Sequence, residues 1–142
     1  MDKLPEHDCK NELRDLSLKA TPARIAVLTY LEKSGTPLDI ASIIEYLKKK
    51  NIKVDQATVF RIINLFTSRG LTRQIQLQEG KFRYEVASKP DHHHLICKKC
   101  GQIEDISDCK ISKLEKEIET KKKFKIVSHS LEFFGICEDC QK

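Results

Sequence analysis

Two cysteine pairs, each with two intervening residues, are the strongest chemical signal in the chain. They are Cys97-Lys-Lys-Cys100, followed by Gly101, and Cys137-Glu-Asp-Cys140, with 36 residues between them. Two intervening residues let both sulfurs reach one ion across a tight turn, and glycine tolerates the φ that such a turn requires. Two such pairs complete a tetrahedral four-thiolate shell for Zn²⁺ with no position for a substrate. The spacing therefore predicts a structural zinc site, whereas a single pair could instead be a redox motif.

Three histidines immediately precede the first cysteine pair and form a second potential metal site. On a strand, His92 and His94 point to one face and His93 to the other. With two carboxylates they would form a nitrogen and oxygen shell suited to Fe²⁺, Mn²⁺, Zn²⁺ or Ni²⁺. The predicted regulatory set is Glu85, His92, His94 and Asp105. Since Glu85 lies in the other half of the chain, a shared ion would fix how the two halves are oriented. The alternative is an exposed polar linker that contains histidines.

The first half of the chain contains three helix starts. Thr21-Pro22 places a capping residue before a proline, and Asp39 and Asp55 can each cap a further helix. The third helix ends at Arg69-Gly70, after which alternating apolar residues on both sides of Glu79-Gly80 predict a hairpin over 71–86. Helix, helix and hairpin in this order are typical of a winged helix-turn-helix, which reads DNA with the second helix of the pair. The same order also occurs in proteins that do not bind DNA.

The exposed face of the predicted reading helix, from about Gln56 to Arg69, offers Gln56, Thr58, Arg61 and Asn64. The stretch from Lys48 to Arg83 holds nine basic and two acidic residues, and the whole chain has a net charge of +5. A basic patch suits a phosphate backbone, although a charge run by itself is also compatible with a solvated surface.

The second half follows a linker at Ser88-Lys89-Pro90. We predict strands near His93 to Cys97 and Gln102 to Ile106, a helix from about Asp108 to Thr120, and a strand from about Phe124 to Phe134. Ile111, Leu114 and Ile118 form an apolar stripe at helical spacing that could pair two chains. His129 would lie on the last strand, either as a satisfied core residue or as a metal ligand.

Composition restricts the class of protein. The 142 residues contain six cysteines, no stretch long enough to span a membrane and no apolar signal segment, which predicts a soluble cytoplasmic protein. Cys9 and Cys109 have no partner pattern and receive no role.

These motifs together resemble the ferric uptake regulator family of metal-dependent repressors over nearly the whole length. The most specific segment is His92-His-His-Leu-Ile-Cys97-Lys-Lys-Cys100-Gly101. The other matching segments are Thr21-Pro-Ala-Arg24, Ala57-Thr-Val-Phe-Arg61, Phe82-Arg-Tyr-Glu85, His129-Ser-Leu-Glu132 and Gly135-Ile-Cys137-Glu-Asp-Cys140.

The resemblance implies an α+β fold, with a winged-helix DNA-binding domain over 1–87, a hinge over 88–91 and a zinc-binding α/β dimerisation domain over 92–142. It implies structural Zn²⁺ on the four cysteines and a regulatory Fe²⁺, Zn²⁺ or Mn²⁺ on the set that includes Glu85. A further metal site is predicted at Asp91, His93 and His129. Three positions depart from the family pattern: Phe60 replaces a common tyrosine, Thr36 a frequent ligand histidine, and Ser112 a usual acidic residue.

The predicted function is therefore a homodimeric repressor of metal-homeostasis or oxidative-stress genes that binds palindromic double-stranded DNA when its regulatory metal is bound, and not an enzyme. The predicted DNA-contacting residues are Arg24, Lys53, Thr58, Phe60, Arg61, Asn64 and Arg73. The alternatives are a metal-dependent hydrolase and a thiol redox sensor that uses the cysteine pairs.

Overall fold

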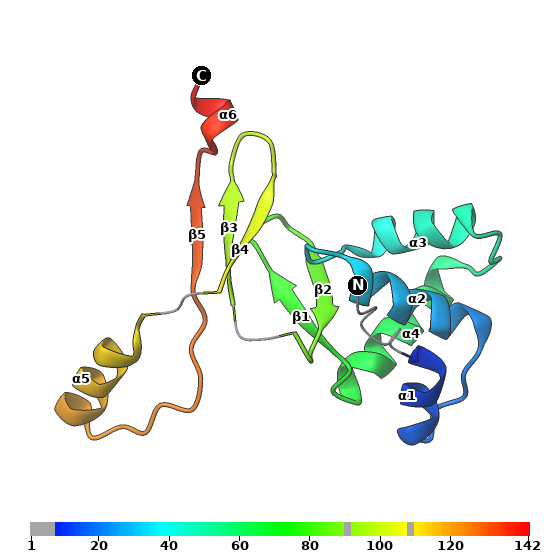
Figure 1. Cartoon of the computed structure of the whole chain (residues 1–142), viewed down its shortest axis with the longest axis horizontal. Coiled ribbons are helices and arrows are strands. Elements are labelled where there is room, and N and C mark those ends of the chain that lie inside the picture. The colour runs from blue at the N-terminus through cyan, green and yellow to red at the C-terminus, as the bar shows by residue number, and fades with distance from the viewer. Residues whose placement is uncertain (1–7, 90–91, 108–109) are drawn as a thin grey trace, which may run out of the picture. The chain divides into compact units, whose positions relative to one another are not determined.

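The computed structural model describes residues 8–89, 92–107 and 110–142 (Figure 1). The chain forms two compact units, Met1–Lys89 and Pro90–Lys142. The predicted hinge over 88–91 includes residues 90 and 91, which lie outside the described residues, as do Asp108 and Cys109.

The described part of the first unit, residues 8–89, contains four helices: α1 (Cys9–Asp15), α2 (Pro22–Lys33), α3 (Ile40–Lys49) and α4 (Gln56–Ser68). The three caps predicted from the sequence are confirmed. The Thr21 hydroxyl accepts a bond from the Arg24 amide, and the Asp39 and Asp55 carboxylates accept bonds from the third amide after each of them. These oxygens satisfy amides that a helix N-terminus leaves without partners, so the sequence fixes where each helix begins. The short helix α1 was not predicted.

A continuous apolar core joins these helices. The side chains of Val27, Ile43, Val59, Ile63 and Phe66 are fully buried within it. Because they recur at helical spacing on α2, α3 and α4, each helix turns one face inward. This packing holds α4 by its buried face and leaves its opposite face exposed.

A two-stranded antiparallel sheet follows α4. It consists of β1 (Thr72–Gln76) and β2 (Phe82–Val86), in the register that places Arg73 opposite Glu85. Leu38 adds a short bridge to Tyr84 through two backbone hydrogen bonds of 2.8 and 2.9 Å. The hairpin is thereby tied to the segment before α3. The predicted hairpin and the helix-helix-hairpin order are both confirmed.

The second unit contains a three-stranded sheet in the order β4-β3-β5 (Figure 1). Strand β3 (His93–Cys97) pairs antiparallel with β4 (Ile103–Ile106) and parallel with β5 (Glu132–Gly135). Helix α5 (Ser112–Lys122) lies between β4 and β5 in the sequence, and the short helix α6 (Glu138–Gln141), which was not predicted, ends the chain.

Two predicted elements of this unit were wrong in extent. The strand expected from Phe124 to Phe134 is confined to β5, and residues 124–131 form neither helix nor strand. Phe124 and Val127 are 68% and 87% exposed, so the alternation that starts at Val127 reflects no buried sheet face within the chain. Helix α5 begins at Ser112 rather than near Asp108, and it extends two residues beyond Thr120, ending before Lys123 in the left-handed conformation.

Candidate metal centres and DNA-reading surface

The four cysteines of the two pairs converge in the second unit. Their sulfurs all lie within 4.8 Å of one another, and no disulfide joins them. The Sγ atoms of Cys100 and Cys137 are 3.7 Å apart. Two sulfurs bound at about 2.3 Å to one tetrahedral zinc ion would be separated by about 3.8 Å, so the donor set fits Zn²⁺. Gly101 has the positive φ, +78°, that the turn between Cys97 and β4 requires.

Two of these thiols have pKa values that are shifted in opposite directions from the ordinary value for cysteine. The backbone amides of Cys100 and Cys137 donate to Cys97 and lower its pKa to about 6. The neighbouring Cys137 thiol and burial raise the pKa of Cys140 to about 12. Four adjacent sulfurs cannot all be negative unless a cation balances them, because like charges disfavour further ionisation. The charges of clustered thiolates therefore favour a bound cation, as the spacing of the sulfurs does.

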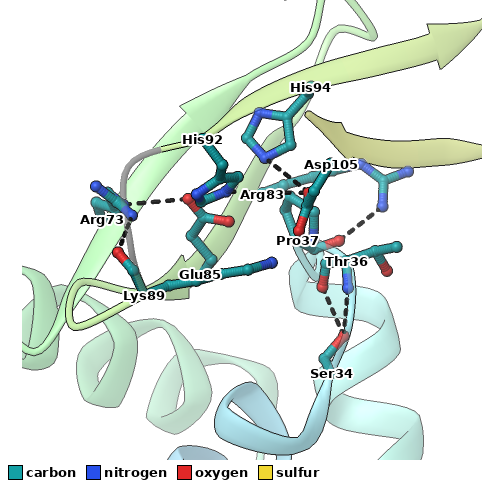
Figure 2. Close-up of polar contacts among 10 residues, drawn as sticks. All are labelled: Ser34, Thr36, Pro37, Arg73, Arg83, Glu85, Lys89, His92, His94 and Asp105. Carbon is teal, nitrogen blue, oxygen red and sulfur yellow. Dashed lines mark hydrogen bonds and ion pairs between the residues drawn. The ribbon is translucent and has the colours of Figure 1, made fainter. Parts of the chain in front are cut away.

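A second group of ligand atoms lies on and beside β3 and β4. Asp105 is opposite His94 in the strand register, and its Oδ1 lies 3.7 Å from Nε2 of His94 and 4.0 Å from Nε2 of His92. Both imidazole side chains are nearly buried, at 4% and 6% exposure. Figure 2 shows the contact between His94 and Asp105. The structure thus brings together three of the four residues predicted for the regulatory site. Two imidazoles and a carboxylate are ligands typical of first-row divalent metals.

The fourth predicted ligand, Glu85, lies on β2 of the first unit. Its side chain is 6% exposed and accepts a 3.1 Å bond from Nε of Arg73 on the opposite strand. A terminal guanidinium nitrogen of Arg73 also donates to the backbone carbonyl of Lys89 at 3.0 Å (Figure 2). Arg73, predicted from the sequence to contact phosphate, therefore forms its hydrogen bonds within the first unit, to Glu85 and Lys89.

His93 and His129 meet on the other side of β3. Their Nε2 atoms are 3.2 Å apart, and Nδ1 of His129 lies 2.7 Å from Oε1 of Glu115 on α5. Sequence reasoning missed Glu115, because it sought an acidic residue at Ser112. The signal was available, since Glu115 lies three residues later on the same helix and such positions share one face. Asp91, also predicted near this site, lies outside the described residues.

The predicted DNA-reading residues lie mainly on α4. Arg61 and Asn64 are exposed, Thr58 is half-buried, and Phe60 is 40% exposed. Lys53 is exposed in the turn before α4, and the Arg24 guanidinium donates to the carbonyl of Lys19 near the start of α2. Helix α4 therefore has a buried apolar face and an outer face that carries Arg61, Asn64 and the partly exposed Phe60, an arrangement that suits a major-groove reader.

Thr36, which replaces the frequent ligand histidine, lies in the loop before α3. Its backbone amide and carbonyl both bond to the Ser34 hydroxyl, at 3.3 and 2.5 Å (Figure 2). A threonine here offers no imidazole nitrogen to a metal.

Comparison with known proteins identifies the family. The model of the ferric uptake regulator family matches residues 15–134, which cover most of both units. The chain belongs to the ferric uptake regulator family. It is similar to the ferric uptake regulation protein of Legionella pneumophila, at 34% identity over 92% of this chain and 96% of the relative. Among solved structures, the Helicobacter pylori ferric uptake regulator matches with a TM-score of 0.81 and 28% identity, covering 94% of this chain and 89% of that one. The Campylobacter jejuni peroxide stress regulator matches with a TM-score of 0.70 and 29% identity, covering 94% and 100%.

Family membership confirms the predicted α+β class and the broad function. The ferric uptake regulator family consists of metal-responsive transcriptional regulators that bind DNA and act as dimers. The chain is accordingly a regulator of transcription and not an enzyme, and the hydrolase and redox-sensor alternatives are disfavoured. Among the described residues, none of the helices combines the length and apolar character needed to cross a bilayer.

Proposed function

We propose that this chain is a repressor of metal-homeostasis or oxidative-stress genes, which binds palindromic operators as a homodimer when a regulatory divalent cation is bound. The observation that carries the proposal is the convergence of His92, His94 and Asp105 in the unit that also contains the four-cysteine cluster. The DNA partner also supports a cytoplasmic location.

The four cysteines would hold a structural Zn²⁺ that supplies no chemistry beyond coordination. The two cysteine pairs lie at the end of β3 and after β5, so one ion would hold the carboxyl ends of these two neighbouring parallel strands together. Metal-binding energy then becomes folding energy for this unit.

For the regulatory ion we propose the ligands Glu85, His92, His94 and Asp105, with Fe²⁺, Zn²⁺ or Mn²⁺ as the cation. The first unit would contribute Glu85 alone, because Thr36 supplies no imidazole. An ion that requires Glu85 as well as the histidines couples its own occupancy to the orientation of the reading helices. These four ligands would then form the site that senses the metal.

His93 and His129 would hold a further ion through their Nε2 atoms. Two nitrogens about 2.1 Å from one ion are separated by about 3.0–3.4 Å, and the observed distance is 3.2 Å. Glu115 accepts a hydrogen bond from Nδ1 of His129, which places the ring's lone pair on Nε2. Glu115 is therefore a positioning residue for His129 rather than a ligand.

On the DNA side, Arg61, Asn64 and Thr58 are the proposed base or phosphate readers, with Arg24 and Lys53 as phosphate contacts. We expect Arg61→Ala to weaken binding to DNA selected from a random pool by about 1–3 kcal/mol at fixed salt. Unchanged affinity would remove Arg61 from the reading set.

The ligand assignment is tested by Mn²⁺ titration of the zinc-loaded protein against a chromophoric chelator. Glu85→Gln and His94→Ala should each weaken Mn²⁺ binding by about tenfold or more, since each removes a metal-bound donor. Glu79→Gln is the matched control, because Glu79 is a carboxylate of the same hairpin that pairs with Arg83 and belongs to no proposed site. Wild-type Mn²⁺ affinity in Glu85→Gln would contradict its assignment as a ligand.

A further inference from the structure

Arg73 makes two contacts that the proposed reading of DNA does not use. Its Nε binds the Glu85 carboxylate, and a terminal nitrogen binds the carbonyl of Lys89, the last residue of the first unit (Figure 2). The cross-strand register sets this pair, since Arg73 on β1 lies directly opposite Glu85 on β2. A single guanidinium thus connects a proposed metal ligand to the end of the DNA-reading unit.

The two partners differ in their access to water. The Glu85 side chain is 6% exposed, whereas that of Arg73 is 38% exposed. A nearly buried carboxylate requires a positive partner, because its desolvation is costly. The partly exposed guanidinium can turn into solvent on its flexible stem with little cost. Glu85 is therefore fixed in place and Arg73 is exchangeable.

We propose that Arg73 is an internal counter-ion that competes with the regulatory cation for Glu85. This inference rests on the proposed function, in which Glu85 is a metal ligand. In the metal-free protein the guanidinium neutralises Glu85. When the divalent cation binds Glu85, it repels Arg73 and takes its place, and the guanidinium leaves for solvent with its charge intact.

The exchange also alters the end of the first unit. While Arg73 binds Glu85, it also donates to the carbonyl of Lys89. The Lys89 amide closes a turn by donating to the carbonyl of Val86 at 3.4 Å. Departure of the guanidinium removes this bond. Cation binding at Glu85 is thereby transmitted to the backbone where the DNA-reading unit ends.

The hairpin provides a matched pair that lacks this arrangement. Arg83 forms two bonds of 2.8 Å with Glu79 and donates to the carbonyl of Pro37 at 3.0 Å. It is also an arginine that binds one carboxylate and one backbone carbonyl, but its carboxylate belongs to no proposed metal site. Substitution of Arg83 therefore controls for the loss of an ion pair in this sheet.

The experiment measures Mn²⁺ affinity of the zinc-loaded full chain in R73Q, R73K, R83Q and E85Q. We expect R73Q to bind Mn²⁺ about two- to fivefold tighter than the wild type, because its competitor is gone and a partly exposed ion pair contributes about that factor. R73K keeps the charge and should stay within about twofold of the wild type, which also tests the idea if R73Q folds poorly. R83Q should leave Mn²⁺ affinity unchanged.

A second measurement is amide hydrogen exchange over Val86–Lys89. Exchange should be faster in R73Q than in the wild type without Mn²⁺, and Mn²⁺ should accelerate it in the wild type only. Unchanged or weaker Mn²⁺ binding by R73Q, with E85Q still impaired, would overturn the counter-ion role and leave Glu85 as a ligand. Wild-type Mn²⁺ affinity in E85Q would instead overturn the ligand role and this inference together.

Discussion

The two units of the chain bury very different amounts of apolar surface. In the first, α2, α3 and α4 enclose a core that includes the fully buried side chains of Ile63 and Phe66. In the second, Ile96, Cys97 and Ile103 are the only buried apolar residues among those that the structure describes. Several large apolar side chains of that unit are exposed, namely Leu95, Leu114, Ile118, Phe124, Val127, Phe133 and Ile136.

This difference separates two sources of stability. A unit with a continuous core is held by its own side chains, whereas a small unit without one needs a metal or a partner subunit. The four cysteines could hold such a metal, and we expect the exposed apolar residues to form the surface for a second copy. We therefore expect the first unit to fold by itself and the second unit to need bound ions or a partner.

The largest expected effect is that of zinc removal. Chelation under reducing conditions, or Cys137→Ser, should unfold the second unit and leave the first folded, because the thiolate cluster replaces a core there. Heteronuclear NMR would show dispersed amide signals from residues 8–89 and collapsed signals from residues 110–142. Native dispersion of the amide signals from both units after the loss of zinc would contradict the expectation that the second unit needs zinc to fold.

The next effect is a cavity in the first unit. Phe66→Ala should lower the free energy of unfolding by about 3–5 kcal/mol, since the ring is fully buried. Urea denaturation monitors the change, and zinc content should remain at the wild-type value. A loss of zinc in this variant would show that the two units do not fold independently.

A smaller effect is expected at the exposed stripe of α5. Leu114→Glu should weaken dimerisation by about 2–4 kcal/mol, because a buried leucine contributes about 1.5–3 kcal/mol and a charge adds a desolvation cost. Analytical ultracentrifugation measures the equilibrium, and Lys113→Glu on the same helix is a charge control. If Leu114→Glu dimerises like the wild type, this stripe is not the interface.

The smallest effect concerns acid stability of the first unit. Burial would raise the pKa of Asp39, but bonds from Lys81 and Ser42 outweigh it and hold the pKa well below its ordinary value of 3.8. A lowered folded pKa adds stability above pH 3.8, and this stability is lost as the pH falls through the folded pKa. Asp39→Ala should lower the free energy of unfolding by about 1 kcal/mol at neutral pH and flatten its dependence on acid. Thermal unfolding between pH 2 and pH 7 checks this, with an unchanged acid profile as the contradictory result.

The first unit could be predicted further from sequence than the second. The side chains of Thr21, Asp39 and Asp55 each accept a bond from an amide three residues later, so the start of each helix depends on nearby residues and can be predicted from the sequence. The alternation of Val127, His129 and Leu131 also suggested a strand, but a strand needs a neighbour, and residues 124–131 have no strand pairing in the structure. An alternating apolar pattern in a sequence is the same whether its apolar side chains are buried within the chain or against a second chain.

The metal ligands could be predicted by residue type, whereas the residues that position them could not. Cysteine pairs and adjacent histidines reveal themselves by spacing, as the convergence of Cys97 and Cys137 and of His94 and Asp105 shows. Glu115 and Arg73 are common charged residues whose roles depend on α5 and on the hairpin register. Only the fold distinguishes them from solvated surface charges.

The central claim is that a cation bound in addition to zinc controls the reading of DNA. The direct test is the affinity of the zinc-loaded protein for DNA selected in the presence of Mn²⁺, measured by fluorescence anisotropy at fixed salt as Mn²⁺ is added. We expect the affinity to rise with Mn²⁺ while the zinc content stays constant, and we expect Glu85→Gln to abolish the rise. Equal affinity with and without Mn²⁺ would contradict it.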